Sequence, residues 1–455
     1  MTKSIKTTNK YIEKTKNTVN NSYRLDYHMM PTVGWMNDPN GLIYYKGRYH
    51  LFYQANPYDT APGTMCWGHF VSDDLITYED LGIAIAPEKE HTSIFSGGAI
   101  EIDGQLNAIY TLHYEKGDTK REYIYKSVSS DGVNFGGDTC IFDNETLPKN
   151  LSRKDFRDPY PVKIGDRYYV FVGGTDVNLK KGVIVVLSGT TLDYLHYEFC
   201  IGPFYEFGEM CECPCYVRMD GKDVIVTSAY ATPRRGNDFK NTHSSMFVVG
   251  DIDFERGVMA VDYVKEIDKG NTFYAPQLMN GTDTPTMVGW LEMWNTPYLT
   301  HLLHHGWVGA FSIPRVLSFK DGDVCQNPVE TLASYYKGDA DGNCFSHCAD
   351  LSFKFGGNGK LTVKGGNGEV VIGHHDGAVF LDTMNAKTPH GHVRQTNRRY
   401  DSCEVRVLLD TSSVEVFVDG GREVISSRIY IDGEYKLEVS GDVSEIRIKE
   451  VCTKQ

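Results

Sequence analysis

The sequence lacks the features of several large protein classes. It has no run of about 18–20 consecutive apolar residues, the length that a membrane-spanning helix needs. Residues 1–20 contain five lysines but no apolar core of a secretory signal, so we expect a cytoplasmic protein. Basic residues are fewer than acidic ones, 46 against 60, and the net charge of −14 disfavours nucleic acid and anionic membranes as partners.

Metal-ligand patterns are also scarce. The eleven cysteines cannot all pair, and no CxxC recurs at the spacing of a zinc site. Cys211, Cys213 and Cys215 would share one face of a strand, an arrangement that rarely supplies a tetrahedral site. The HLLHH segment at 301–305 is not a zinc-protease pattern, and no loop has the clustered oxygen ligands of a calcium site. We therefore expect neither a metal nor a cofactor.

Glycine and tyrosine, in contrast, are abundant, with 45 and 29 residues. Runs of Val, Ile, Tyr and Phe alternate with glycine-containing turns throughout the chain, which predicts an all-β protein. The one helix candidate is short and polar, at Lys10–Thr18. A length of 455 residues exceeds one ordinary domain of about 100–200 residues.

Five hairpin-like segments repeat along the first two thirds of the chain. Their turn glycines are Gly47, Gly104, Gly165, Gly221 and Gly281, separated by 57, 61, 56 and 60 residues. A steady period of this kind, with one hairpin in each unit, indicates a repeat architecture. Because strands of one hairpin cannot bury both faces alone, the units must stack, and radial stacking gives a β-propeller. We predict a five-bladed β-propeller at residues 26–317.

The last hundred residues have a different rhythm. Short alternating strands such as SVEVFVDG follow one another between Gly and Asp turns, which is typical of a β-sandwich. We assign residues 1–25 to a lead-in, 318–345 to a linker and 346–455 to the sandwich. The sandwich carries no catalytic motif; it is expected to pack against the propeller or to form a homodimer, and the sequence leaves both open.

Acidic residues recur just before the turn glycines. Asp38, Asp158 and Glu212 precede them by nine, seven and nine residues, and Ser96 and Tyr274 occupy the corresponding positions of the other two blades. Inner strands of a propeller surround one channel, so the three acids are expected to converge there at equivalent depth. Converging carboxylates repel one another, and one then takes up a proton while another stays ionised.

This pair of protonation states is what glycoside hydrolysis requires, with one carboxylic acid for the leaving oxygen and one carboxylate for the anomeric carbon or a water. Aromatic residues that stack on sugars and donors for hydroxyl groups lie near the same strand ends. The aromatic candidates are Trp35, Trp67, Phe95, Tyr274, Trp290 and Trp294, and the polar candidates are Asn37, Gln54, Ser96 and Arg157. A lone Asp-Pro is more often a surface turn, but the repetition across blades favours a site.

The segment WMNDPNG at 35–41 resembles the nucleophile motif of the β-fructofuranosidases, the invertase and sucrose-6-phosphate hydrolase family (glycoside hydrolase family thirty-two). FSGGA, FRDPYP, ECP, FYAPQ and HGWVGAFSIPRVL resemble further motifs of that family, in the same order, and DTSSVEVFVDGG resembles its C-terminal sandwich. The resemblance implies a retaining mechanism in which Asp38 is the nucleophile, Glu212 the acid/base and Asp158, with Arg157, the stabiliser of the transition state.

The resemblance implies sucrose as substrate, and the acidic net charge fits a neutral sugar better than an anionic one. A sucrose-6-phosphate hydrolase or an exo-acting fructan hydrolase would use the same site, and a non-catalytic sugar-binding propeller is a remote alternative. The chain departs from many family members at Pro62, Cys66 and Cys211, which leaves the leaving-group preference open. Arg234–Arg235 would either meet a substrate phosphate or form a solvated loop pair.

Overall fold

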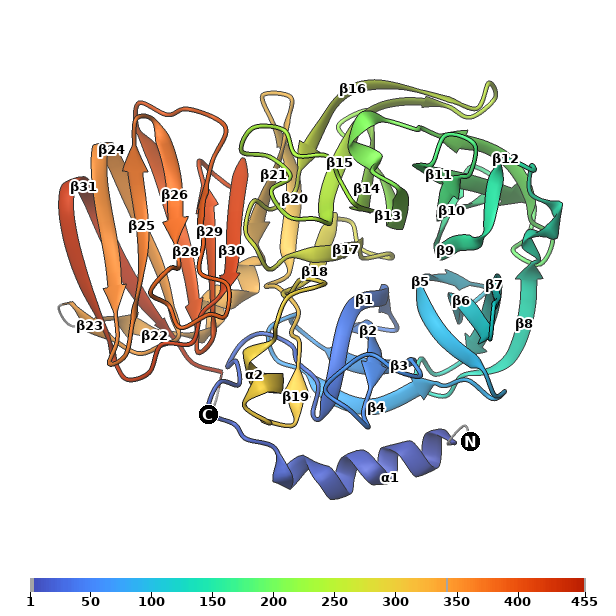
Figure 1. Cartoon of the computed structure of the whole chain (residues 1–455), viewed down its shortest axis with the longest axis horizontal. Helices are drawn as coiled ribbons and strands as arrows, with labels where there is room; N and C mark the ends of the chain where they lie inside the picture. The colour runs from blue at the N-terminus through green and yellow to red at the C-terminus, as the bar shows by residue number, and fades with distance from the viewer. Residues whose placement is uncertain (1–3, 341–342, 454–455) are drawn as a thin grey trace.

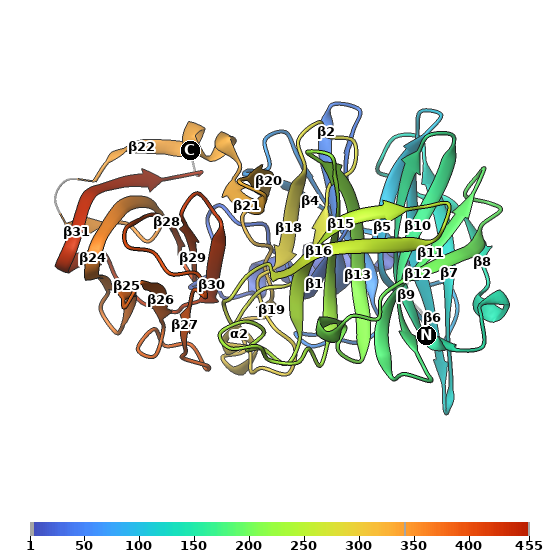
Figure 2. The same cartoon turned by 90° about the horizontal axis from the view of Figure 1, so that it is seen from above.

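The computed structural model describes residues 4–340 and 343–453, which form two β units side by side (Figures 1 and 2). Five four-stranded or five-stranded sheets surround one axis, and a separate sheet unit at the C-terminal end packs against one side of this ring (Figure 1). The predicted fold class, a five-bladed propeller followed by a sandwich, is confirmed.

Each blade runs outward from its first strand. The first blade contains β1 (Gly34–Tyr45), β2 (Arg48–Asn56), β3 (Cys66–Ser72) and β4 (Glu79–Ile85). The second contains β5 (Thr92–Ile102), β6 (Gln105–Lys116), β7 (Thr119–Ser129) and β8 (Gly136–Phe142). The third contains β9 (Leu151–Ile164), β10 (Arg167–Asp176), β11 (Lys181–Gly189) and β12 (His196–Ile201). The fourth contains β13 (Met210–Met219), β14 (Lys222–Tyr230), β15 (Ser244–Asp253) and β16 (Val258–Glu266).

The fifth blade, β17 (Tyr274–Leu278), β18 (Thr286–Trp290), β20 (Arg315–Lys320) and β21 (Asp323–Pro328), closes the ring. Between β18 and β20 the chain leaves the blade, forms α2 (Leu299–Leu302), and adds β19 (Trp307–Val308) in parallel to β1 of the first blade. Strand β21 pairs with β20 along its whole length, so the propeller extends to Pro328. This end lies beyond residue 317, where the sequence analysis placed it, because the excursion interrupts the repeat period.

The turn glycines have the backbone geometry that the repeat requires. All five predicted glycines have positive φ, from +59° at Gly165 to +83° at Gly47. At Lys46-Gly47, Asp103-Gly104 and Asp220-Gly221 both residues have positive φ, as in the type I′ turns that match the twist of a two-residue hairpin. A residue with a side chain is disfavoured at the glycine position, which is why the period is visible in the sequence.

The C-terminal unit is one sheet that folds into a sandwich. Its strands follow the order β27-β26-β25-β24-β28-β29-β30, and β31 pairs with β22, β23 and β24. Their bounds are β22 (Tyr336–Asp339), β23 (Cys344–Phe345), β24 (Ala349–Lys364), β25 (Glu369–His375), β26 (Ala378–Asp382), β27 (Val393–Gln395), β28 (Cys403–Asp410), β29 (Ser413–Val418), β30 (Glu423–Arg428) and β31 (Tyr435–Val451). One continuous apolar core lies between its layers, and includes Leu351, Val407 and Val416.

A single helix of the lead-in runs along the outside of the first blade (Figure 1). α1 spans Ile5–Thr15 and continues as a 3₁₀ turn at Lys16–Thr18, so it begins five residues before the predicted Lys10. The reason is its N-cap: the Ser4 side chain accepts a hydrogen bond from the amide of Thr7 at 3.3 Å. Among the described residues, no helix has the length and apolarity that crossing a membrane would require.

The two units share an interface with buried charges. An apolar cluster joins Phe417 and Val424 of the sandwich to residues of the first and fifth blades. Beside it, His28 of the segment that precedes β1 donates to Asp410 and Glu415 of the sandwich at 2.7 and 2.8 Å. Arg315 of β20 contacts Glu415 at 2.5 Å, and all four side chains are fully buried. The sandwich is therefore fixed to the propeller through charge as well as apolar contact.

Candidate active site

The inner strand of every blade departs from regular pairing at or beside the predicted site residues. Two residues face a single partner at Asn37–Asp38, Asp158–Pro159, Cys213–Pro214 and Ala275–Pro276, and Ser96 is the extra residue of the second blade. Three of these residues have positive φ: Asp158 (+65°), Cys213 (+47°) and Ala275 (+48°). Because proline donates no amide hydrogen, an irregularity there costs no ladder bond. Bulges re-aim side chains, and here they contain Asp38 and Asp158 and directly follow Glu212.

The bulges arrange the site residues in two layers. Arg157, Glu212 and Tyr274 are each the last paired residue before the bulge of their strand, whereas Asp158 and Cys213 lie one residue further on. The sequence analysis placed Asp158 and Glu212 at equivalent depth in the channel. In the structure, Asp158 lies one residue further along its strand, relative to the bulge, than Glu212 does. The number of residues between each acid and its turn glycine could not show this difference in depth, because a bulge and the length of the turn each change that number.

Asp38 has one carboxylate oxygen engaged and one free of protein partners. Its Oδ2 accepts hydrogen bonds from the Ser96 hydroxyl at 2.8 Å and from the Cys213 thiol at 3.7 Å. Its Oδ1 is buried and has no hydrogen-bond partner among the described residues. Burial raises the pKa of Asp38 to about 6, although hydrogen bonds from Ser96 and Asn37 favour the ionised form. A positioned carboxylate with an unpaired oxygen can act as a nucleophile.

Asp158 is held by the backbone of the neighbouring blade. Its Oδ2 accepts a hydrogen bond from the Cys213 amide at 2.9 Å, and its own amide donates to the Thr111 hydroxyl at 2.9 Å. Burial, followed by the negative charge of Glu212, raises the pKa of Asp158 to about 8, and Arg157 opposes the shift. Asp158 therefore holds a proton more readily than an isolated aspartate does.

Glu212 lies between a cation and a phenol. The Tyr274 hydroxyl donates to its Oε2 at 2.6 Å, and the Nε of Arg157 lies 3.5 Å from its Oε1. Burial, and then the charge of Glu212, hold the pKa of Tyr274 well above its usual value, so Tyr274 remains a donor. The Glu212 side chain is 20% exposed and lines a cavity of about 600 Å³ together with Arg157 and Met210. A carboxyl group that is fixed on both sides and open to a cavity can exchange protons with a ligand.

The predicted aromatic residues separate into two groups. Trp35, Trp290 and Trp294 form one cluster with Tyr298, in which ring centroids lie 4.9–6.3 Å apart, and the Trp35 indole donates to Asn37 Oδ1 at 2.6 Å. Trp67 is instead fully buried between the first two blades. Its indole donates to the Phe95 carbonyl at 3.0 Å, so its place is behind the site.

Gln54 and Phe95 occupy the wall between the first two blades. Gln54 is 2% exposed, and its amide donates to the carbonyl of Ile94 at 3.1 Å. Phe95 is partly buried and packs against the cluster of Trp35 and Trp290 on one side. On its other side it stacks on His113, with ring centroids 4.2 Å apart.

Glu122 and His113 are site-supporting residues that the sequence analysis missed. They face each other across the hairpin of β6 and β7, where His113 Nδ1 lies 3.2 Å from Glu122 Oε1. Glu122 Oε1 also accepts from Arg157 Nη1 at 2.5 Å. In the sequence, the only sign of this pair is a histidine and a glutamate nine residues apart on two strands of one hairpin. Alternating strands carry many such charged residues. Only the contact of Glu122 with Arg157 in the third blade distinguishes this pair from the others.

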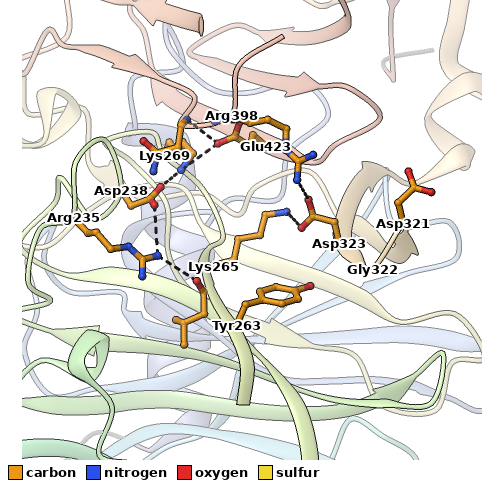
Figure 3. A pocket seen from close by; sticks show the side chains of 12 residues that line it. Arg235, Asp238, Tyr263, Lys265, Lys269, Asp321, Gly322, Asp323, Arg398 and Glu423 are labelled. Atoms are coloured by element: carbon orange, nitrogen blue, oxygen red, sulfur yellow. Dashed lines mark hydrogen bonds and ion pairs between the residues drawn. The ribbon is translucent and has the colours of Figure 1, made fainter. Parts of the chain in front are cut away.

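Two further predictions fall outside this site. Arg235 lies in a cavity of about 410 Å³ between the propeller and the sandwich, where its guanidinium lies 3.6 Å from Asp238 (Figure 3). It also contacts Glu206 at 2.7 Å. Lys269 joins Asp238 to Glu423 of the sandwich across the same cavity (Figure 3). His301 of the HLLHH segment is hydrogen-bonded through Nδ1 to the Thr60 hydroxyl at 2.7 Å. These side chains have structural partners within the fold.

Comparison with known proteins identifies the architecture. The model of the glycosyl hydrolases family 32 N-terminal domain matches residues 28–328, and that of the family 32 C-terminal domain matches residues 340–450. Raffinose invertase of Escherichia coli is 31% identical over 449 residues, which cover 89% of each chain. Sucrose-6-phosphate hydrolase of Escherichia coli is 29% identical over 446 residues, which cover 90% of each chain.

Solved structures agree. The family 32 β-fructofuranosidase of Bombyx mori superimposes with a TM-score of 0.88 at 30% identity over 98% of both chains. A mutant of the same enzyme, solved in complex with sucrose, gives a TM-score of 0.87. The five inner strands, the three acids at or beside their bulges and these matches lead to one conclusion: the chain belongs to glycosyl hydrolase family 32 and is a glycoside hydrolase.

Proposed function

We propose that the protein is a retaining β-fructofuranosidase that hydrolyses sucrose. The observation that carries this proposal is the difference between the surroundings of Asp38 and Glu212. Asp38 presents a buried oxygen that has no partner within residues 4–340 and 343–453, and Glu212 faces a cavity between Arg157 and Tyr274. One carboxylate is thus placed to attack, and the other to exchange a proton with the leaving group or with water.

The reaction proceeds in two displacements. Asp38 Oδ1 attacks the anomeric carbon of the fructosyl unit, the bond to the glucosyl oxygen breaks, and Glu212 gives its proton to that oxygen. A fructosyl ester of Asp38 remains. Glu212 then takes a proton from water, whose oxygen attacks the anomeric carbon and releases Asp38. Asp158, 5% exposed, is placed to accept hydrogen bonds from fructosyl hydroxyls, and these strengthen as positive charge develops on the ring.

Glu212→Ala tests these roles. We expect kcat/KM on sucrose to fall by at least about 10²-fold, because the leaving oxygen loses its proton donor. Sodium azide should then intercept the fructosyl enzyme and give a fructosyl azide of retained configuration, because a small anionic nucleophile needs no general base. Unchanged sucrose cleavage, or initial release of fructose with inverted configuration, would show that the roles are wrong.

The cavity beside Glu212 supports sucrose over its 6-phosphate. Its charged lining consists of Asp155, Glu209 and Glu212 against Arg157 and Lys180, and Arg157 already contacts Glu122. A glucosyl 6-phosphate would add a charge of about −1.5 to −2 to this acidic surface. We expect kcat/KM for sucrose to exceed that for sucrose-6-phosphate by about 10-fold or more.

Sucrose-6-phosphate is the second candidate, and Lys180 is the residue that favours it. Parallel assays with sucrose, sucrose-6-phosphate and inulin decide the matter. If the phosphate is the better substrate, the preference for sucrose is refuted, and Lys180→Ala should then lower kcat/KM for sucrose-6-phosphate while leaving that for sucrose unchanged. If inulin is hydrolysed as well as sucrose, the enzyme is an exo-acting fructan hydrolase.

A further inference from the structure

One buried carboxylate, Glu122 of β7, has no part in the reaction described above. Its side chain is fully buried, and a carboxylate in such a place needs compensating partners. Its Oε1 lies 2.5 Å from Arg157 Nη1 and 3.2 Å from His113 Nδ1, and its Oε2 accepts from the Phe156 amide at 2.8 Å. Lys120 Nζ lies 3.6 Å away.

These partners connect Glu122 to both sides of the active site. On one side Arg157 continues to Glu212, with 3.5 Å between Nε and Oε1. On the other side His113 stacks on Phe95, which belongs to the aromatic wall of the site. The ion pair is stable, because burial opposes ionisation of Glu122 but the charge of Arg157 lowers its pKa to about 2.

We propose that Glu122 is a positioning residue for the reaction: its negative charge neutralises Arg157 and thereby sets how readily Glu212 gives up its proton. This inference rests on the proposed role of Glu212 as general acid. Arg157 lies close enough to Glu212 to stabilise its carboxylate strongly. A second carboxylate on Arg157 offsets part of the positive charge that Arg157 presents to Glu212.

Other charged groups face the same three residues and remain constant in the test. Arg157 also lies 3.6 Å from Asp155, and Asp158 acts on it through space. Glu212 faces Tyr274, and its charge acts on Asp38, Asp158 and His243. Glu115 bonds the far nitrogen of His113 at 3.2 Å and is 63% exposed. Glu115 is therefore a matched control, a carboxylate on the same histidine that does not contact Arg157.

Glu122→Gln keeps the size and the hydrogen-bond acceptor and removes the charge. The basic limb of the kcat/KM profile on sucrose reports loss of the proton that the general acid must hold. We expect this limb to move to lower pH by roughly one unit, because Arg157 is left without its counter-charge. Glu115→Gln should leave the limb within roughly 0.2 units, since screening weakens an exposed charge. A limb that stays in place in Glu122→Gln would overturn the proposal.

Two further variants keep the outcome decisive. In Glu212→Gln the basic limb of the kcat/KM profile should disappear. If the limb persists, Glu212 is not the general acid, and this failure is distinct from a limb that stays in place in Glu122→Gln. If Glu122→Gln does not fold, Lys120→Met replaces it, because Lys120 is 27% exposed and its loss leaves the charge of Glu122 less compensated. The basic limb should then move to higher pH, opposite in sign. No movement in Lys120→Met would refute the proposal, since a merely structural contact changes activity without displacing the profile.

Discussion

The buried His28, which lies between the propeller unit and the sandwich, should make the protein less stable as the pH rises into the alkaline range. His28 has carboxylates on both ring nitrogens, Asp410 at 2.7 Å and Glu415 at 2.8 Å, and none of the three side chains is exposed. Two acceptors require two protons on the ring, so the imidazole is charged in the folded protein. Burial opposes this charge, but the hydrogen bonds that His28 donates to Asp410 and Glu415 raise its pKa to about 9.

The size of the effect follows from the gap between the folded and unfolded pKa. In the unfolded chain His28 titrates near 6.5, so the folded protein holds an extra proton between about 6.5 and about 9. Below pH 6.5 this contribution to the free energy of unfolding is complete, and it is lost as the pH rises through about 9. At about 1.4 kcal/mol for each pH unit, it amounts to about 3 kcal/mol.

Urea unfolding at a series of pH values from 6 to 9.5 measures this contribution. Far-ultraviolet circular dichroism follows both units, and tryptophan fluorescence follows the propeller, which contains all five tryptophans. The midpoint of the wild type should fall steadily over this range. His28→Gln should be less stable by about 3–5 kcal/mol at pH 7, because two buried carboxylates lose their cation.

The comparison of the two pH dependences decides the argument. His28→Gln should lose most of the decline between pH 6.5 and 9, whereas His375→Gln, whose side chain is 69% exposed, should retain it. Other groups that titrate above pH 9 act equally on all three proteins. If the wild type and His28→Gln lose stability in parallel, His28 is not charged in the folded state, and the reasoning is refuted.

Three further changes have defined outcomes. Ser96→Ala removes the 2.8 Å hydrogen bond that favours ionised Asp38, so the acid limb of kcat/KM, expected near pH 6, should move upward; an unchanged limb would argue against Asp38 as the ionised nucleophile. Tyr274→Phe removes the 2.6 Å donor to Glu212, and the basic limb should move to higher pH with a loss in kcat/KM of about 10-fold. Gly421→Ala would set a Cβ 1.6 Å from the Gln326 carbonyl at a φ of +80°, so unfolding by urea should show a loss of at least about 2 kcal/mol, and wild-type stability would contradict the interface geometry.

Local sequence was sufficient for the architecture. Turn glycines at positive φ, such as Gly47 and Gly221, recur once in each blade, because a residue with a side chain is disfavoured there. The period of the propeller is therefore visible in the sequence. The alternation of apolar and polar residues at 413–418 predicted a strand of the sandwich, although both faces of β29 are buried in the structure. The motif WMNDPNG at 35–41 indicated the family through its resemblance to the family's nucleophile motif.

The end of the propeller and the start of the helix were less accessible. Strand β21 follows an excursion that pairs with the first blade, and such pairing joins residues about 270 positions apart, as between Gly34 and Trp307. No local pattern records a contact at that distance. The helix begins at Ile5 because Ser4 caps it. A single serine in a polar, weakly periodic segment is a weak signal of a helix start.

The sequence by itself predicted which acids carry the chemistry, and the tertiary structure decided the surroundings of each of them. Asp38, Asp158 and Glu212 are the same kind of group, and their differences arise from neighbours on other blades: Ser96, the Cys213 amide, and Arg157 with Tyr274. Proton affinity depends on burial and on charges within a few ångströms, which chain order does not encode. For the same reason Glu122 became visible only when the second and third blades were placed side by side.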